Sequence, residues 1–122
     1  MKKKVLVVDD SEVARKFVLD ILKKGPYTTL EPRDGNEALK LLAAHPDTSV
    51  IFTDINMPGL NGLEMLERIK DDPVLRHIPV CVLTTESSPD SLARAKALGV
   101  NAFLVKPVKV EQLDLVMKSL AR

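Results

Sequence analysis

The chain has 122 residues, of which 45% are hydrophobic and 29% charged, and its formal net charge at pH 7 is +1. This length and composition predict one globular domain over residues 1–122, large enough to bury a single core. The nearly balanced charge excludes a broad basic surface of the kind that binds nucleic acid or an anionic membrane.

Five short apolar runs, rich in Val, Ile and Leu, predict β-strands. Because these runs are apolar on both faces, they are typical of a parallel sheet covered by helices on each side. In chain order, the predicted strands are Lys4–Val8, Thr28–Glu31, Val50–Thr53, Val80–Thr84 and Ala102–Val105.

Helical patterns alternate with these strands. The first helix follows Ser11, a good N-cap, and ends before residues 25–26, which are Gly-Pro. The second begins at Asp34, with Glu37 three residues on, an Asp version of the capping box. The residues expected on the inward face of the first helix are Ala14, Phe17, Val18, Ile21 and Leu22.

The three remaining helices are predicted from about Gly62 to near Asp71, from the N-cap Ser88 to just before Gly99, and over about Val110–Leu120. The fourth helix turns mostly small residues inward, so it is expected to bury little. The inward residues of these helices are Leu63, Leu66 and Ile69, then Leu92, Ala93, Ala95, Ala97 and Leu98, then Leu113, Val116, Met117 and Leu120.

Strict strand–helix alternation with right-handed crossovers predicts an α/β fold with a doubly wound, five-stranded parallel sheet. In such a sheet, the loops after the first, third, fourth and fifth strands converge beside the switch point in strand order. Polar residues stand at those strand ends, so we expect a single site there. They are Asp9, Asp10, Asp54, Thr84 and Lys106.

Three crowded carboxylates repel one another unless a cation is present. With the lysine, their formal charge is −3 + 1 = −2, which one Mg²⁺ would cancel. Carboxylate, carbonyl and water oxygens suit Mg²⁺, and no His or Cys cluster indicates zinc. A carboxylate can attack phosphorus to form an acyl phosphate, while Lys106 and Thr84 could stabilise the phosphoryl oxygens.

The ordered set resembles the receiver domain of two-component response regulators over essentially the full chain. The matching features are Asp9-Asp10, Asp54 with Met57-Pro58 and Gly62, Thr84, and Lys106-Pro107. Each is weak alone, and their order at strand ends makes the set specific. The resemblance implies a flavodoxin-like (βα)5 fold with strand order 2-1-3-4-5 and a signalling protein that catalyses only its own phosphorylation and dephosphorylation.

The resemblance also implies roles for individual residues. Asp54 would be the phosphoacceptor, receiving its phosphoryl group from a phosphohistidine on a sensor histidine kinase or phosphotransfer protein. Asp10, Asp54 and the backbone carbonyl of Asn56 would bind Mg²⁺ directly, with Asp9 acting through water. Thr84 and Lys106 would bind the phosphoryl group.

A conformational switch is implied as well. Thr84 would move towards the phosphoryl group, and Phe103 would rotate inward as the switch aromatic. Asn56 and Glu86 would tune the lifetime of the acyl phosphate. The face formed by the fourth helix, fifth strand and fifth helix would bind a downstream protein.

Two residues depart from the family pattern. Thr85 stands where Ala or Gly is typical, and its bulk would restrict access of small phosphodonors to the site. Phe103 replaces the Tyr of chemotaxis-type relatives, which removes a hydroxyl and favours the inward, buried state.

Two other classes of protein are alternatives to a receiver domain. Haloacid-dehalogenase-like phosphatases have Asp-x-Asp after the first strand and a cap domain, whereas residues 9–11 here are Asp-Asp-Ser and there is no room for a cap. A flavodoxin-type nucleotide or flavin binder would need a phosphate cradle, and the acidic loop has no Gly-rich segment. Whether the chain is a whole regulator or a receiver from a longer protein stays open.

The remaining expectations concern location. No apolar run reaches the roughly 20 residues that span a bilayer, and the start of the chain leads directly into a strand rather than a signal peptide. Cys81, the single cysteine, is expected to be buried and cannot form an internal disulfide. We therefore expect a cytoplasmic monomer.

Overall fold

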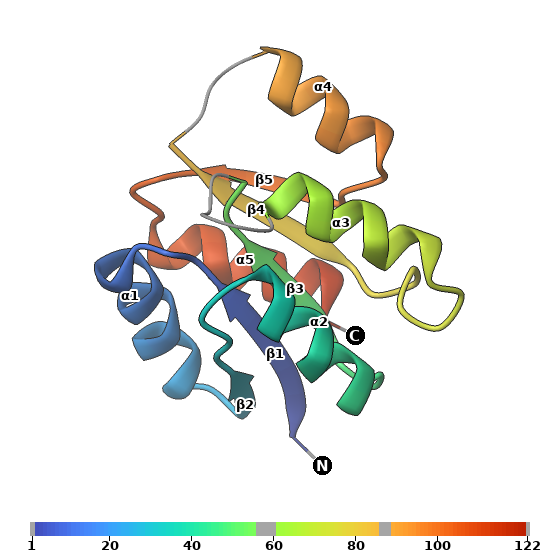
Figure 1. Ribbon diagram of the computed structural model, residues 1–122. Coiled ribbons are helices and arrows are strands. Elements are labelled where there is room, and N and C mark those ends of the chain that lie inside the picture. Colours follow the sequence, from blue (N-terminus) through green and yellow to red (C-terminus); the bar gives the residue numbers. More distant parts are fainter. Residues whose placement is uncertain (1, 56–60, 86–88, 122) are drawn as a thin grey trace.

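The computed structural model describes residues 2–55, 61–85 and 89–121, and strands and helices alternate along the chain (Figure 1). The strands are β1 (Lys3–Val8), β2 (Tyr27–Leu30), β3 (Val50–Thr53), β4 (Val80–Thr84) and β5 (Ala102–Val105). The helices are α1 (Glu12–Lys23), α2 (Gly35–Ala44), α3 (Gly62–Asp71), α4 (Pro89–Ala97) and α5 (Val110–Leu120).

The five strands form one sheet in the order β2-β1-β3-β4-β5, and every pair is parallel. The predicted doubly wound, flavodoxin-like fold is therefore confirmed. β1 and β2 each begin one residue before the predicted start, and β2 also ends one residue earlier than predicted. The order changes direction between β1 and β3, which places the ends of these two strands beside each other.

Alternate residues of β1 point to opposite faces of the sheet and enter different apolar clusters. Val5 and Val7 pack with buried residues of α1 and α5, whereas Leu6 and Val8 pack with those of α2 and α3. Both faces of the sheet are therefore covered, α1 and α5 lying on one side and α2, α3 and α4 on the other (Figure 1). Cys81 is fully buried in the α1/α5 cluster, as predicted, and burial raises the pKa of its thiol to about 12.

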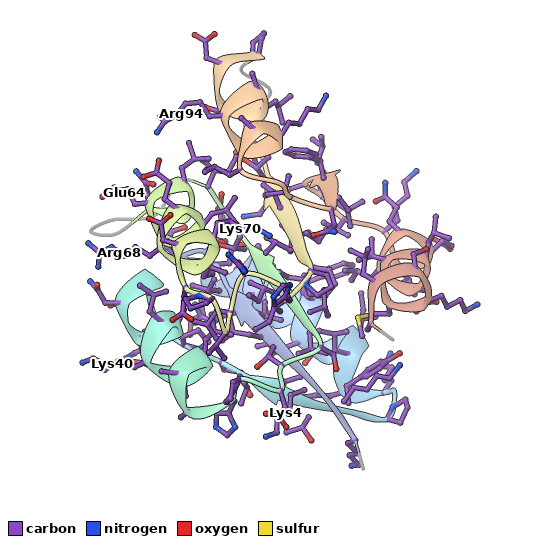
Figure 2. All side chains as sticks on the ribbon, turned by 90° about the vertical axis from the view of Figure 1, so that its right-hand side faces the viewer. Lys4, Lys40, Glu64, Arg68, Lys70 and Arg94 are labelled. Carbon is purple, nitrogen blue, oxygen red and sulfur yellow. The ribbon has the colours of Figure 1, made fainter. Side chains whose placement is uncertain are left out.

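Charged side chains cover the outer surfaces of α2, α3 and α4, the layer of helices on one side of the sheet. Figure 2 shows Lys40 on α2, Glu64 and Arg68 on α3, and Arg94 on α4, all of them exposed. Arg94 lies 3.5 Å from Glu67 of α3 in an exposed ion pair, which contributes little to stability. The apolar contacts beneath the helices hold this layer in place.

The inward face of α1 differs from the prediction. Val18 and Leu22 are buried as expected, but Leu19 is buried as well, and Phe17 is 45% exposed. Phe17 instead lines a groove beside the β5–α5 loop. The helical repeat alone could not distinguish the face towards the sheet from the adjacent face towards this loop.

The fourth helix buries little, as predicted. Ala95 is its one buried residue, whereas Ala93 and Ala97, predicted to face inward, are exposed. Small side chains lie on more than one face of α4, so composition did not identify the inward face. The predicted N-cap, Ser88, lies outside the described residues.

Local sequence explains where the helices begin. Ser11, Asp34 and Asn61 are the N-caps of α1, α2 and α3, and each side-chain oxygen accepts from a backbone N–H of the first turn. Glu37 does not complete the predicted capping box as far as the described contacts show, since its carboxylate pairs with Arg33 at 3.0 Å. Among the helices described, none combines the length and apolar character that a membrane span requires.

Candidate phosphorylation and metal site

Four strand ends bring the predicted site residues to one edge of the sheet. Asp9 and Asp10 follow β1, and Asp54 follows β3. The Asp54 amide donates to the Val8 carbonyl at 3.0 Å, which joins the ends of these two strands directly. At the other pair of strand ends, the Lys106 amide donates to the Thr84 carbonyl at 3.0 Å.

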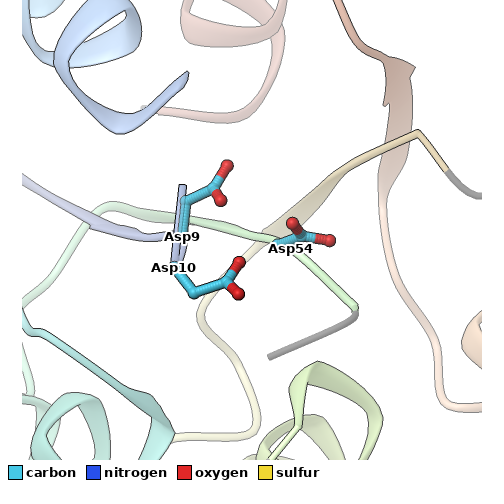
Figure 3. Close-up of side chains that lie close together, drawn as sticks. All are labelled: Asp9, Asp10 and Asp54. Atoms are coloured by element: carbon cyan, nitrogen blue, oxygen red, sulfur yellow. The ribbon is translucent and has the colours of Figure 1, made fainter. Parts of the chain in front are cut away.

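Figure 3 shows the three carboxylates close together at the ends of β1 and β3. One oxygen from each of Asp9, Asp10 and Asp54 can be chosen so that all lie within 4.8 Å of one another. Asp9 and Asp54 are buried, whereas Asp10 is exposed. We call this group the acidic triad, and it forms the predicted cluster at the strand ends.

The ammonium of Lys106 lies between the two buried carboxylates. Its Nζ donates to Asp54 Oδ2 at 2.8 Å and lies 2.5 Å from Asp9 Oδ2. The second contact is an ion pair without the alignment of a hydrogen bond, so Asp9 Oδ2 is a buried oxygen with no aligned donor. The lysine thus partly compensates the negative charge of the triad.

The pKa values of Asp9 and Lys106 are both raised. Burial raises the pKa of the Asp9 carboxyl, and the neighbouring Lys106 ammonium and Ser11 amide only partly offset this effect. Burial lowers the pKa of Lys106, but its contacts with Asp54 and Asp9 outweigh burial and raise the pKa overall. Lys106 therefore stays charged at neutral pH while charge on Asp9 is disfavoured.

These residues fit Mg²⁺. The donor set consists of carboxylate oxygens, which Mg²⁺ prefers, and one oxygen of each of the three carboxylates lies within 4.8 Å of the others. The exposed position of Asp10 leaves that carboxylate accessible to a hydrated cation. Asn56, whose backbone carbonyl was expected to complete the set, lies outside the described residues.

The other predicted residues are placed as follows. Thr84 is 1% exposed at the end of β4, opposite Val105 of β5. Phe103 is half-buried and packs on the cluster that contains Ile55 and Ala95. Glu86, Met57 and Pro58 lie outside the described residues.

Gly62 is packed against the end of β3. Its amide donates to the Ile55 carbonyl at 2.8 Å. A Cβ at Gly62 would lie 2.0 Å from the Asp54 carbonyl oxygen and 2.8 Å from the Ile55 Cα. Any side chain at position 62 would collide with the backbone of Asp54, so the close approach of α3 requires glycine there.

The contact of Arg15 with the site was not predicted from the sequence. Its Nη1 donates to the backbone carbonyl of Asp9 at 2.7 Å. A usable signal was present, because long side chains in a helix lean towards its N-terminus, so a residue in the second turn of α1 can reach the end of β1.

An apolar groove of about 380 Å³ adjoins the site. Val13 and Phe17 of α1 form one wall and Pro107 and Val108 of the β5–α5 loop another, while Asp9, Lys106 and the exposed Thr85 also line it. The bond between Lys106 and Pro107 is cis. The groove therefore reaches from exposed apolar residues to two charged residues of the site.

The family model for the response regulator receiver domain matches residues 5–118. The chain therefore belongs to the receiver domains of response regulators, the signalling modules of two-component systems.

Individual relatives support this assignment over nearly the whole chain. Chemotaxis protein CheY1 of Helicobacter pylori is 38% identical over 119 residues, an alignment that covers 93% of this chain and 96% of that protein. The polar-differentiation response regulator DivK of Brucella anthropi is 37% identical, with 98% of this chain and 96% of that protein covered. The structure of Vibrio cholerae chemotaxis protein CheY4 superposes with a TM-score of 0.90 at 33% identity, covering 98% of this chain and 99% of that one.

Proposed function

We propose that the chain is a single receiver domain over residues 1–122, switched by phosphorylation of Asp54. The observation that carries the proposal is the arrangement of the acidic triad with Lys106, whose ammonium contacts both buried carboxylates. Asp54 stands at the centre of this arrangement, within the triad and bonded to the lysine.

In the proposed reaction, a carboxylate oxygen of Asp54 attacks the phosphorus of a phosphohistidine on a sensor kinase or phosphotransfer protein. An O–P bond forms while the N–P bond breaks, and the electron pair of the N–P bond stays on the ring nitrogen. The imidazole leaves as a neutral ring because its other nitrogen already carries a proton. Lys106 keeps its proton and offsets charge on the phosphoryl oxygens, while the Thr84 hydroxyl donates to one of them. Bound Mg²⁺ would neutralise further charge on these oxygens.

Asp10, Asp54 and the Asn56 carbonyl are proposed to bind that cation directly, with Asp9 acting through water. In the switch, Thr84 is drawn towards the phosphoryl group and Phe103 turns further into the cluster on which it already packs. Asn56 and Glu86 are proposed to set the lifetime of the acyl phosphate, which the domain itself hydrolyses.

Transfer from a phosphorylated kinase tests the proposal. We expect label to reach the parent protein in the presence of Mg²⁺, as resolved on a phosphate-affinity gel, and to be absent from Asp54→Asn. Label that persists in this variant at another residue would show that Asp54 is not the sole phosphoacceptor.

The apolar groove is proposed as the surface that receives the phosphohistidine protein. Val13 and Phe17 are 83% and 45% exposed, and the groove they line ends at Asp9 and Lys106. A donor that brings its phosphohistidine to Asp54 would cover these apolar side chains and gain from their burial.

The groove can be tested by comparing two kinds of donor. Phe17→Ser should slow transfer from the kinase and leave phosphorylation by acetyl phosphate, which needs no docking, unchanged. Val74→Ser is the matched control, because Val74 is 61% exposed and precedes β4 in the chain, whereas the site follows the strands. Equal losses with both donors would indicate damage to the site rather than loss of a docking surface.

A further inference from the structure

Arg15 is bonded to the acidic triad without belonging to it. It lies in the second turn of α1, half-buried, and its Nη1 donates to the Asp9 carbonyl at 2.7 Å. Hydrogen bonds from a charged donor are about twice as strong as neutral ones. The bond therefore fixes the backbone where β1 ends and the loop to α1 begins.

Asp9 is held through all three of its oxygens. The Ser11 amide donates to Oδ1 at 2.9 Å, Lys106 contacts Oδ2, and Arg15 holds the backbone carbonyl. These contacts come from the N-cap of α1, the β5–α5 loop and α1 itself. Asp9 is thus a rigid part of the site.

Asp10 is in the opposite situation. Its carboxylate is exposed, and within residues 2–55, 61–85 and 89–121 no side-chain hydrogen bond or ion pair holds it. The position of this carboxylate therefore depends on the backbone that carries it. The peptide group joining Asp9 to Asp10 contains the carbonyl that Arg15 holds.

We propose that Arg15 is a positioning residue for the metal ligand Asp10. By holding the Asp9 carbonyl, it orients the peptide group between the two aspartates and keeps the Asp10 carboxylate turned towards Asp9 and Asp54. Arg15 itself touches neither the cation nor the phosphoryl group. This inference rests on the proposed Mg²⁺-dependent function.

A purely electrostatic role would have the opposite consequence. The guanidinium brings a positive charge to the backbone of Asp9, next to the proposed ligand Asp10, and a nearby like charge opposes binding of a cation. If Arg15 acted only through its charge, its removal would tighten Mg²⁺ binding. If Arg15 positions Asp10, its removal weakens binding, so the sign of the change distinguishes the two roles.

The test uses three variants and isothermal titration of Mg²⁺. Arg15→Met removes the donor and the charge, Arg15→Lys keeps the charge and a single donor, and Lys16→Met removes a charge from an exposed neighbour on the same helix. We expect Arg15→Met to bind Mg²⁺ roughly tenfold more weakly, the lower end of the effect of residues that orient metal ligands. Arg15→Lys should recover part of this loss, and Lys16→Met should match the parent or bind slightly more tightly.

A second measurement separates positioning from general damage. Phosphorylation by acetyl phosphate should need more Mg²⁺ to reach half its maximal rate in Arg15→Met, yet approach the parent rate at saturating Mg²⁺. Binding in Arg15→Met that equals or exceeds the parent's would overturn the inference. If Arg15→Met does not fold, Arg15→Ala takes its place, and a folded Arg15→Ala that binds Mg²⁺ as tightly as the parent would overturn it too. Failure of the parent to bind Mg²⁺ at all would instead overturn the proposed function.

Discussion

Asp9, Asp10 and Asp54 have different environments, although one oxygen from each lies within 4.8 Å of the others. Asp9 and Asp54 are buried and contact Lys106, whereas Asp10 is exposed. The lysine therefore compensates two carboxylates from inside the site and leaves the third facing solvent. This division suits a site in which a cation enters at Asp10 and chemistry occurs at Asp54.

Asp10→Asn should remove most of the stabilisation that Mg²⁺ provides. At about ten times its dissociation constant, Mg²⁺ should raise the parent's free energy of unfolding by about 1.4 kcal/mol. The variant loses a direct ligand, so its urea midpoint should hardly respond to the metal. Without metal, the variant should be at least as stable as the parent, because one of three like charges has been removed.

The matched control is Asp20→Asn, which removes an exposed carboxylate from α1 further along the helix. Its response to Mg²⁺ should equal the parent's. A full Mg²⁺ shift in Asp10→Asn, or a lower metal-free midpoint, would contradict the electrostatic account of the triad.

The sequence predicted correctly the site residues whose positions are determined by the end of a strand. Asp9, Asp54 and Lys106 were each assigned to the end of an apolar run, and parallel pairing then placed them together. The bond from Arg15 to Asp9 was missed, because it depends on the direction of one long side chain rather than on any periodic pattern.

At the scale of elements, the start of α5 is weakly capped. Lys109 is the N-cap residue, with extended backbone (φ −97, ψ 151), and its ammonium cannot accept a hydrogen bond from the first turn. Only the reverse contact exists, in which the Lys109 amide donates to Gln112 Oε1 at 2.9 Å. Half of a capping box is therefore present.

Lys109→Ser should complete this capping box with Gln112 and stabilise the protein by about 0.5–1.5 kcal/mol. Urea melts provide the measurement. Lys118→Ser, in the last turn of the same helix, is the control and should be neutral or slightly destabilising, because it removes a favourable charge there. An unchanged midpoint in Lys109→Ser would contradict the argument from capping.

Gly62→Ala should destabilise the protein by roughly 1–3 kcal/mol, since the new methyl group would overlap backbone atoms that cannot rotate away. Displacement of Asp54 should also slow phosphorylation. In the control, Gly25→Ala, the obstacle is the side chain of Tyr27, which can move, so the loss should be smaller. A parental urea midpoint in Gly62→Ala would show that α3 can shift without cost.

Within residues 2–55, 61–85 and 89–121, the sequence identified all ten helices and strands, but it identified the inward faces of the helices less well. For α5 the prediction of Leu113, Val116 and Met117 is confirmed, although Leu115 of the same helix is 66% exposed. For α1 the prediction of Phe17 is wrong, since the apolar residues there serve both the core and the groove. An apolar groove next to the core places further apolar residues on the helix and so obscures the periodic pattern on which sequence reasoning depends.

At the scale of the whole molecule, the helix with the fewest buried residues, α4, lies beside β5. This strand forms one edge of the sheet, and α4 above it contributes a single buried residue, Ala95. Phe103 of β5 packs on the same small cluster. Few buried contacts mean a low local free energy of opening, as expected of a surface that changes on signalling.

Hydrogen exchange should locate this change. With Mg²⁺ and beryllofluoride, a mimic of the phosphoryl group, exchange should alter in α4, β5 and α5, the proposed surface for a downstream protein. Asp54→Asn, treated in the same way, should show no such change. Alterations confined to α1 and α2 would place the responsive surface elsewhere.

The most direct test of the account is chemical identification of the phosphorylated residue. Borohydride reduces an aspartyl phosphate to homoserine, which mass spectrometry of the peptides can assign to one position. After phosphorylation in the presence of Mg²⁺, the account predicts homoserine at position 54 alone, and none when Mg²⁺ is chelated. Homoserine at position 9 or 10, or at position 54 without Mg²⁺, would contradict it.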